Sequence, residues 1–247
     1  KPILQLALLI LIFLFLLRGG TQKIPISASK AFFSKNQTDN YAAVNKERYF
    51  IESYLNSIAY SQIKKIDTNA ENIDSTMNSD CVDFYISKIK SPNIVLLIME
   101  GIPSAALNLK RNDTLLLENL TRISKEGLNF TNAFSSGFRT DQGIASIFNG
   151  LPAYPYLNTL KQFPNLNKHK NRIDEMNSLG YKTSFIYGGE SQFSNLKKYF
   201  LNTKLDNLID CDYFPDQNKT SSWGVPDHIL LDTAYNIISR SNNPSFT

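Results

Sequence analysis

The sequence of 247 residues contains little cysteine, no block of basic charge and none of the common nucleotide-binding or zinc-protease motifs. Its two cysteines, Cys81 and Cys211, are too far apart for a metal-binding spacing and allow at most one disulfide, whose formation the sequence leaves open. The 26 lysines and arginines barely exceed the 22 acidic residues and are scattered, whereas nucleic-acid-binding proteins concentrate positive charge on one face. We therefore expect no nucleic-acid partner. The patterns G-x-x-x-x-G-K-[ST], G-x-G-x-x-G and H-E-x-x-H are absent, so the sequence indicates no P-loop, no dinucleotide-binding fingerprint and no zinc-protease site.

A run of apolar residues, 3–17, is interrupted only by Gln5. It is shorter than the roughly 20 residues that span a bilayer. A secretory signal peptide would need a small-residue cleavage site, but Arg18 follows the run directly. A buried core helix rarely carries leucine and isoleucine around its whole circumference. We therefore interpret residues 1–18 as the C-terminal part of a transmembrane helix, and the chain as an excerpt of a longer protein.

Residues 19–90 are polar and irregular, and we interpret them as a juxtamembrane region of helix and linker. Residues 45–63 carry apolar side chains at helical spacing. The predicted helix could lie on the membrane surface or against the domain that follows. Residues 66–80 contain few large apolar groups, which is typical of a linker or exposed turn.

From Ser91 onward, strand and helix patterns alternate. The short apolar run 94–99, between Pro92 and Gly101, predicts a central strand of a parallel sheet that is covered on both faces. Alternating order predicts an α/β fold with a mostly parallel sheet flanked by helices. The remaining predicted elements are strands at 128–134 and 181–187 and helices at 114–125, 141–148, 171–179, 194–201 and 227–239.

Two side chains in this part could carry chemistry. Glu100 directly follows the predicted strand 94–99, and ligands of open α/β sheets gather at the carboxyl ends of the strands. An exposed loop acid would be an equally good reading of its position alone. Thr140 begins the predicted helix 141–148, where free N–H groups suit a phosphate, although threonine is also an ordinary N-cap. Its hydroxyl needs activation, for example by a divalent metal. We hypothesise that Glu100 is a metal ligand, that Thr140 is both ligand and nucleophile, and that Arg139 binds an anionic oxygen.

Residues 92–101, Pro-Asn-Ile-Val-Leu-Leu-Ile-Met-Glu-Gly, resemble the opening of the alkaline phosphatase/sulfatase superfamily, whose strand-end acid binds the catalytic metal. Residues 138–143, Phe-Arg-Thr-Asp-Gln-Gly, and 148–155 are similar to the lipoteichoic acid synthase branch. Its members are membrane-anchored phosphoglycerol transferases with a threonine nucleophile. Three more matching segments follow in the order of the family, at 179–189, 193–195 and 223–227.

The resemblance implies that residues 91–247 are the N-terminal portion of a sulfatase-like catalytic domain with an alkaline phosphatase-like fold. It implies one divalent metal, manganese first with magnesium or zinc as alternatives, and a lipid head-group donor such as phosphatidylglycerol. It also implies that the catalytic domain lies outside the cytoplasmic membrane. The oligomeric state stays open.

The resemblance also suggests substrate contacts in the loop 188–195, which in the family lines the glycerol-phosphate pocket with a tryptophan and basic residues. Here Phe193 and Asn195 stand in their place beside Glu190, so the transferred head group stays open. We expect Glu190, Phe193 and Asn195 to bind substrate, with core packing as the alternative for Phe193.

Two departures from the superfamily pattern limit the prediction. Sulfatases proper need a C/S-x-P-x-R signature, and this chain has Thr-Asp-Gln-Gly-Ile from Thr140, so hydrolysis through formylglycine is not expected. The remaining metal ligands of the family are an Asp-His pair and a later histidine, and neither His169 nor His228 lies in such a motif. We expect those ligands beyond Thr247 and the chain alone to be inactive. A phosphodiesterase or phosphatase, or an inactive protein that binds glycerol-phosphate polymer, are the alternatives.

Overall fold

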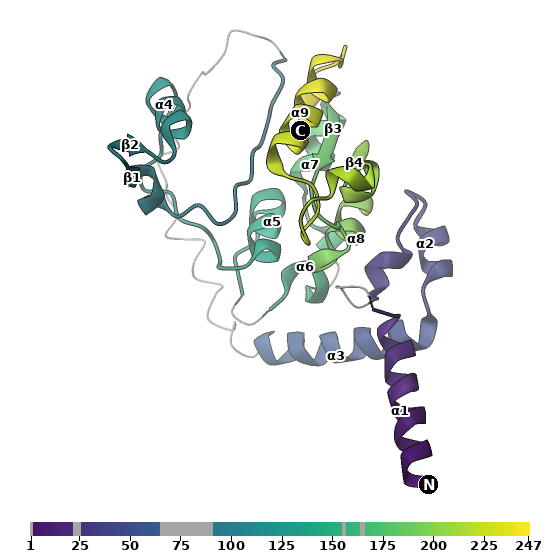
Figure 1. Ribbon diagram of the computed structural model, residues 1–247. Helices are drawn as coiled ribbons and strands as arrows, with labels where there is room; N and C mark the ends of the chain where they lie inside the picture. The colour runs from purple at the N-terminus through teal and green to yellow at the C-terminus, as the bar shows by residue number, and fades with distance from the viewer. Residues whose placement is uncertain (1, 22–25, 65–90, 155–156, 164–165) are drawn as a thin grey trace.

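The structure is a computed structural model, and it is shown in Figure 1. The predicted linker at 66–80 and Cys81 lie outside the residues that it describes. The described residues are 2–21, 26–64, 91–154, 157–163 and 166–247.

The N-terminal part of the chain is helical. Helix α1 (Pro2–Arg18) is apolar around its circumference, and its large side chains are exposed, from 45 % for Ile12 to 83 % for Ile3. At 17 residues it falls short of a bilayer, and none of the described helices is long and apolar enough to cross one. Helices α2 (Gln37–Ala43) and α3 (Lys46–Lys64) follow, so the helix predicted at 45–63 is confirmed.

The remaining described elements alternate between helices and short strands. They are η1 (Ala28–Ala31), η3 (Ser104–Asn108), β1 (Lys110–Arg111), β2 (Thr114–Leu115), α4 (Glu118–Glu126), α5 (Thr140–Asn149), α6 (Thr159–Gln162), η4 (Leu166–Lys168), α7 (Arg172–Ser178), β3 (Lys182–Ile186), η5 (Phe193–Asn195), α8 (Leu196–Leu201), β4 (Asn207–Ile209), η6 (Cys211–Tyr213), η7 (Asp216–Asn218), α9 (Asp227–Ser239) and β5 (Ser245–Phe246). The helices predicted over 141–148, 171–179 and 227–239 and the strand predicted over 181–187 are confirmed by α5, α7, α9 and β3.

The main sheet has the strand order β4-β3-β5, and both pairings are parallel. Residues 94–96 continue it beyond β5, because Ile94 N–H donates to Ser245 O (2.7 Å) and Leu96 N–H donates to Thr247 O (2.8 Å). A parallel sheet with flanking helices agrees with the predicted fold class.

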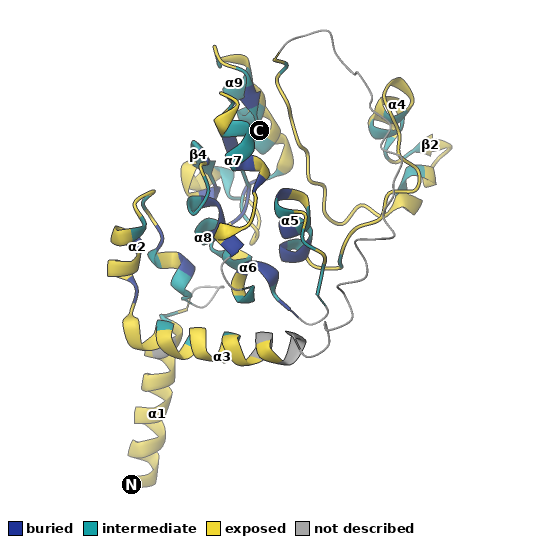
Figure 2. Cartoon of the chain, turned by 180° about the vertical axis from the view of Figure 1, so that it is seen from behind, coloured by how far each residue is buried: buried dark blue, intermediate teal, exposed yellow. Residues whose placement is uncertain are grey.

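Aromatic side chains fill the core between this sheet and helices α5, α7 and α8. The Phe200 ring is fully buried, stacks on Phe185 of β3 at 3.8 Å between centroids, and meets Phe148 of α5 edge-on. Figure 2 shows the buried residues concentrated in these elements, whereas α1 and most of α3 are exposed. The core therefore holds α5, and with it Thr140, rigidly against the sheet.

A carboxylate connects the first residues of β3 with the turn before β4. Asp206 accepts hydrogen bonds from the backbone and hydroxyl of Thr183 (2.9 and 3.1 Å) and from Lys182 Nζ (3.2 Å). Partial burial raises the pKa of Asp206, but these hydrogen bonds outweigh it and hold the pKa below the usual range.

The predicted central strand at 94–99 is wrong in two respects. Only Ile94 forms a bridge to a strand, with Phe246, and the side chains of 94–99 are exposed, from 36 % for Ile94 to 59 % for Val95. Among the described residues, β5 pairs with this segment along one edge and leaves both of its faces open. An apolar run indicates that the side chains of a segment are to be buried, but it does not identify the part of the protein that buries them.

Two further expectations are corrected. The strand predicted at 128–134 consists of turns and irregular backbone, and its apolar side chains, such as Phe134, are exposed. The helix predicted to start at residue 114 starts at Glu118, because Thr114 pairs with Arg111 in a hairpin. Asn112 and Asp113 form the hairpin turn with positive φ angles of 51° and 63°, and such a two-residue turn favours a β-hairpin over a helix.

Candidate functional site

Glu100 and Thr140 are 40 residues apart in sequence but meet in the structure. The Thr140 hydroxyl donates a hydrogen bond to Glu100 Oε2 (2.9 Å), and the pair is accessible to solvent. Glu100 directly follows the segment paired with β5, and Thr140 is the first residue of α5. The carboxylate after the apolar segment 94–99 and the hydroxyl at a helix N-terminus therefore face one another, which is the arrangement that the metal-ligand and nucleophile hypothesis requires. Their roles stay predictions.

Buried polar bonds around Asp141 fix the position of Thr140. Asp141 is 1 % exposed, and its Oδ2 accepts a hydrogen bond from the Thr159 backbone N–H (2.6 Å). Its Oδ1 pairs with Arg139 Nε (2.9 Å). The sequence reasoning assigned Arg139 to an anionic oxygen, and the ion pair holds its half-exposed guanidinium beside the N-terminus of α5. The anion-binding role stays a prediction.

Gln142 ties the first turn of α5 to the loop that follows the helix. Its buried Nε2 donates to the carbonyl oxygens of Tyr154 (3.0 Å) and Leu157 (3.2 Å). Gly137 lies against the same side chain, because an added Cβ would overlap Gln142 and Ala153. The first turn of α5 is therefore tightly packed at Gln142, on the loop before the helix and on the loop after it.

Tyr187, which the sequence reasoning did not single out, completes the group at the strand ends. It directly follows β3, as Glu100 follows the segment next to β5. Burial raises the pKa of the Tyr187 hydroxyl, and the nearby charge of Glu100 raises it further. The phenol therefore stays protonated and can donate a hydrogen bond near the Glu100–Thr140 pair. The available sequence signal was its position as the last residue of the strand predicted at 181–187.

The loop after β3 is held against the 223–227 segment by close backbone contact. Val225 N–H donates to Gly188 O (2.9 Å), and Gly224 has φ +120° with no room for a Cβ beside Gly188. This contact brings Trp223 edge-on to Phe193, with centroids 6.1 Å apart. An exposed aromatic pair therefore stands on this loop, with the tryptophan supplied from a distant part of the sequence.

The other two predicted substrate contacts lie differently. Glu190 is exposed on the same loop, and its charge adds to the acidic surroundings of Cys211. Asn195 turns away into the fold, because its Nδ2 donates to the Leu160 carbonyl oxygen (2.8 Å) and its backbone is left-handed, with φ 67°. The structure thus gives Asn195 a supporting contact, while the substrate roles of Glu190, Phe193 and Asn195 stay predictions.

Comparison with known proteins identifies the family. A family model described as Sulfatase matches residues 92–247, which is more than half of the chain. The chain belongs to the sulfatase family. This confirms the alkaline phosphatase/sulfatase superfamily suggested by the motifs around Glu100 and Thr140, and it indicates an enzyme of that superfamily.

Two solved structures share the fold of this sulfatase-family chain. A protein of the alkaline phosphatase superfamily from Vibrio parahaemolyticus is 28% identical over 65% of this chain and 40% of its own, with a TM-score of 0.56. The lipoteichoic acid synthase LtaP from Listeria monocytogenes is 15% identical over 63% of this chain and 39% of its own, also with a TM-score of 0.56, and this likeness shows the fold alone. The chain spans about two fifths of the length of these structures.

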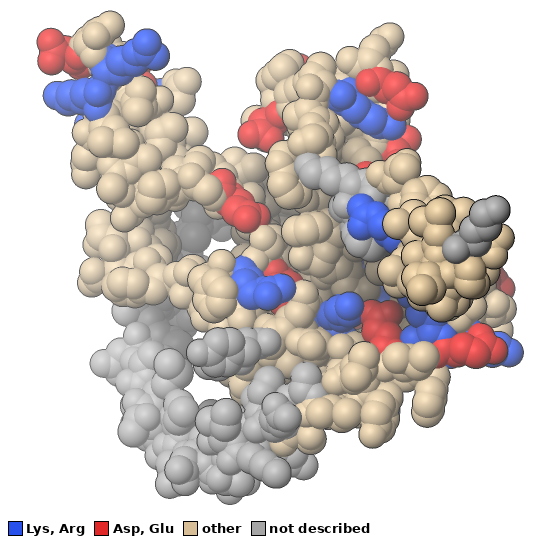
Figure 3. Space-filling model, turned by 60° about the horizontal axis from the view of Figure 1, so that its bottom comes forward, with Lys and Arg blue, Asp and Glu red and all other residues tan. Residues whose placement is uncertain are grey.

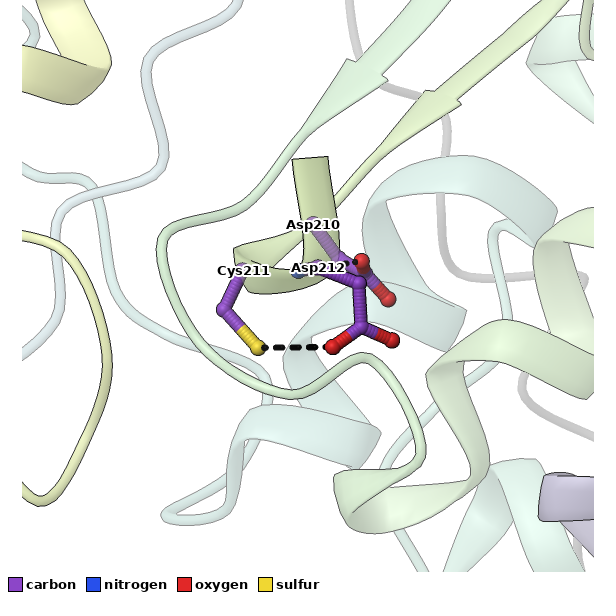
Figure 4. A group of neighbouring side chains, drawn as sticks. All are labelled: Asp210, Cys211 and Asp212. Atoms are coloured by element: carbon purple, nitrogen blue, oxygen red, sulfur yellow. Dashed lines mark hydrogen bonds between the residues drawn. The ribbon is translucent and has the colours of Figure 1, made fainter. Parts of the chain in front are cut away.

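Enzymes of this superfamily depend on divalent metals, and the described residues include a cluster of two aspartates and a cysteine that could hold a cation. Asp210, Cys211 and Asp212 place one ligand atom each within 4.8 Å of one another (Figure 4). Both Asp210 oxygens are already bonded, Oδ2 to the Ser191 hydroxyl and Oδ1 to the Asp212 N–H (3.1 Å). Burial and the adjacent acids raise the pKa of the Cys211 thiol to about 11, and a neutral thiol is a poor ligand. The exposed Glu100–Thr140 pair therefore suits a cation better.

A cavity of about 430 Å³ lies elsewhere, between the helical N-terminal part and the α/β part of this sulfatase-family chain. Tyr49 and Glu52 of α3 line it on one side, and Lys161 and Lys198 line it on the other. Glu52 pairs with Lys161 (2.9 Å), and Lys198 donates to the Tyr49 hydroxyl (3.2 Å). These bonds fix α3 on the α/β part through its polar side.

Proposed function

We propose that the protein transfers a phosphoglycerol group from a lipid donor such as phosphatidylglycerol, in a metal-dependent reaction with Thr140 as nucleophile. The observation that supports this most is the 2.9 Å hydrogen bond between Thr140 at the N-terminus of α5 and Glu100 after the apolar segment 94–99, within a sulfatase-family domain. Since the chain spans about two fifths of the matched structures, the activity is proposed for the protein that carries the whole domain.

Glu100 and Thr140 would hold the cation. A carboxylate and a hydroxyl are hard oxygen donors, which suit manganese or magnesium, and zinc also accepts carboxylate oxygen. Two side chains do not fill a coordination shell, so we propose that the further ligands come from the rest of the catalytic domain. When bound, the metal would lower the pKa of the Thr140 hydroxyl and offset negative charge on the phosphate.

The chain's own groups then account for the first transfer. Thr140 Oγ1 attacks phosphorus and loses its proton, while the bond from phosphorus to the diacylglycerol oxygen breaks and that oxygen takes up a proton. The free N–H groups at the start of α5 and the guanidinium of Arg139 stabilise the developing charge. The product is a phosphoglycerol ester on Thr140.

A second displacement at phosphorus releases the enzyme. An acceptor hydroxyl attacks the phosphoglycerol ester, and Thr140 leaves with a proton. In this proposal the exposed pair of Phe193 and Trp223 and the protonated Tyr187 would contact the glycerol group; the contact between the two rings and the nearness of Tyr187 to Glu100 support it. Helix α1 would anchor this site at the outer face of the cytoplasmic membrane, close to its lipid donor.

The test uses the full-length protein with phosphatidylglycerol labelled in its head group. Thr140→Ala should abolish release of diacylglycerol and leave bound metal, measured by elemental analysis, largely unchanged, whereas Glu100→Gln should lower the metal content. Thr233→Ala, which removes a matched helical hydroxyl in α9, is the control and should transfer normally. Unchanged turnover in Thr140→Ala would refute the nucleophile. Label that reaches only water, with no glycerol-phosphate product on an acceptor, would replace the transferase by a phosphodiesterase.

A further inference from the structure

The amphipathic character of helix α3 is inverted relative to the α/β part of the chain. Its polar side contacts that part through Glu52 and Tyr49, and Ser53 and Asn56 line the cavity between them. A helix that packs on a domain ordinarily buries its apolar stripe against it. Helix α3 does the opposite, so its apolar stripe faces outward.

The outward stripe extends over residues 50–58 of the helix. Its five large side chains are 40–71 % exposed and stand at positions i, i+1, i+4, i+5 and i+8, which share one face of an α-helix. They are Phe50, Ile51, Tyr54, Leu55 and Ile58. Contiguous exposed apolar surface of this kind marks an interaction site.

Helix α1 indicates what covers the stripe. Figure 1 shows α3 running across the end of the α/β part, with α1 projecting from that same end away from the domain, and Figure 2 shows the same arrangement from behind. The apolar stripe of α3 therefore faces the side toward which α1 projects. A helix that is apolar on all sides, as α1 is, suits an environment that is apolar on all sides, and lipid provides this more readily than one protein groove.

The two helices are joined by hydrogen bonds. Ile26 N–H donates to Arg18 O at the end of α1 (3.2 Å), and the Arg48 guanidinium in the first turns of α3 donates to Ile26 O. These contacts place Arg18 and Arg48 near the junction, where anionic lipid head groups would meet them. Figure 3 brings this end of the molecule forward, and in its described part basic and acidic groups are interspersed among uncharged residues.

We propose that α3 is an interfacial helix that lies in the head-group region of a phospholipid bilayer, with Phe50, Ile51, Tyr54, Leu55 and Ile58 in the lipid. Such helices sink about 5–10 Å into the boundary between head groups and acyl chains. The inference rests on the membrane anchoring in the proposed function, and adds that the polar face of α3 then holds the α/β part at a fixed orientation to the bilayer.

Tryptophan quenching in single-copy nanodiscs of phosphatidylglycerol and phosphatidylcholine tests this. The full chain carries Trp223→Phe, which removes its only natural tryptophan, and one new tryptophan at Tyr54 or at its neighbour Ser53 on the polar side. Lipids brominated on the acyl chains should quench Tyr54→Trp severalfold more than Ser53→Trp. Equal quenching in chains that are bound to the discs would overturn the interfacial helix and leave the α1 anchor standing. Chains that do not bind the discs at all would overturn both.

A second pair of variants tests the stripe itself. In the Tyr54→Trp chain, Ile51→Asp with Leu55→Asp should lift the helix and reduce quenching to the level of Ser53→Trp. The apolar control, Ile51→Val with Leu55→Met, should keep the full quenching. Unchanged quenching in the aspartate variant would overturn the proposal. Shielding of Tyr54→Trp that appears only in discs with two copies would overturn it in favour of a dimer interface.

Discussion

Replacing Asp141 by alanine removes a buried carboxylate and should destabilise the chain strongly. The carboxylate is 1 % exposed and holds two partners, the Thr159 N–H (2.6 Å) and Arg139 Nε (2.9 Å). A hydrogen bond to a charged group contributes about 1.5–3 kcal/mol, and an ion pair to a half-exposed arginine contributes about 0.5–1 kcal/mol. Because Thr159 is fully buried, water cannot replace the lost acceptor. The expected loss is about 3 kcal/mol.

A matched control separates the effect of burial on stability from the effect of losing a hydrogen bond. Asp174 accepts an equally short bond, from Lys204 N–H (2.6 Å), but at an exposed site. Asp174→Ala should cost about 1 kcal/mol or less, since water takes over as acceptor. Asp141→Asn keeps an oxygen for Thr159 and should fall between the two alanine variants.

Thermal unfolding followed by circular dichroism, with urea denaturation as a second measurement, gives the difference. For a chain of this size about 3 kcal/mol corresponds to a fall in Tm of roughly 6–12 °C. In the full-length protein Asp141→Ala should also slow transfer, because the first turn of α5 would no longer hold Thr140 at its place. A fall in Tm no greater than that of Asp174→Ala would refute the reasoning from burial.

Three further predictions concern other parts of the fold. Gly224→Ala should cost at least about 2–3 kcal/mol in urea denaturation, because its φ of +120° and a neighbouring carbonyl oxygen exclude a methyl group, whereas Gly143→Ala, which meets no atom within 4 Å, should be tolerated. Cys211, whose thiol pKa burial and adjacent acids raise to about 11, should react slowly with iodoacetamide at neutral pH in the folded chain, with a rate that keeps rising to about pH 10; fast labelling at pH 7 would contradict this. Asp206 has a lowered pKa in the folded chain, so it should stabilise the fold above the ordinary aspartate pKa of about 4 and lose this contribution as pH falls through the lowered value. Asp206→Asn should then show a flatter decline in stability between neutral and acid pH.

Elements with their own boundary signals could be predicted from sequence. Helix α9 occupies Asp227–Ser239 as expected, and α5 ends where Gly150 adopts a left-handed backbone with φ 68°. These signals depend on the local backbone, so they end a helix regardless of the surrounding tertiary structure. Residues 94–99 show the limit of this approach. Their apolar pattern predicts a buried strand, but in the described chain β5 pairs with them along one edge only and their side chains are exposed.

The candidate site divides in the same way. Glu100 was chosen by the rule that ligands gather where the strands of an open α/β sheet end, and the same rule could have predicted Tyr187, which follows β3. The bonds that Asp141 and Gln142 make to residues 154–159 could not be predicted, because those partners are backbone groups, which any residue type supplies. Trp223 lies beside Phe193 because the backbone of Gly224 packs against Gly188, and no pattern of side chains in the sequence predicts that contact.

The pairing of residues 94–96 with 245–247 has a consequence for synthesis of the chain on the ribosome. The carboxylate of Glu100 follows a segment that has no described strand partner until the polypeptide has been made as far as Thr247. Helix α5 packs on residues as far along the chain as Phe200, so its core contacts can form before the last residues have been made. We therefore expect the hydrogen bond between Glu100 and Thr140 to form only after residues 245–247 have left the ribosome.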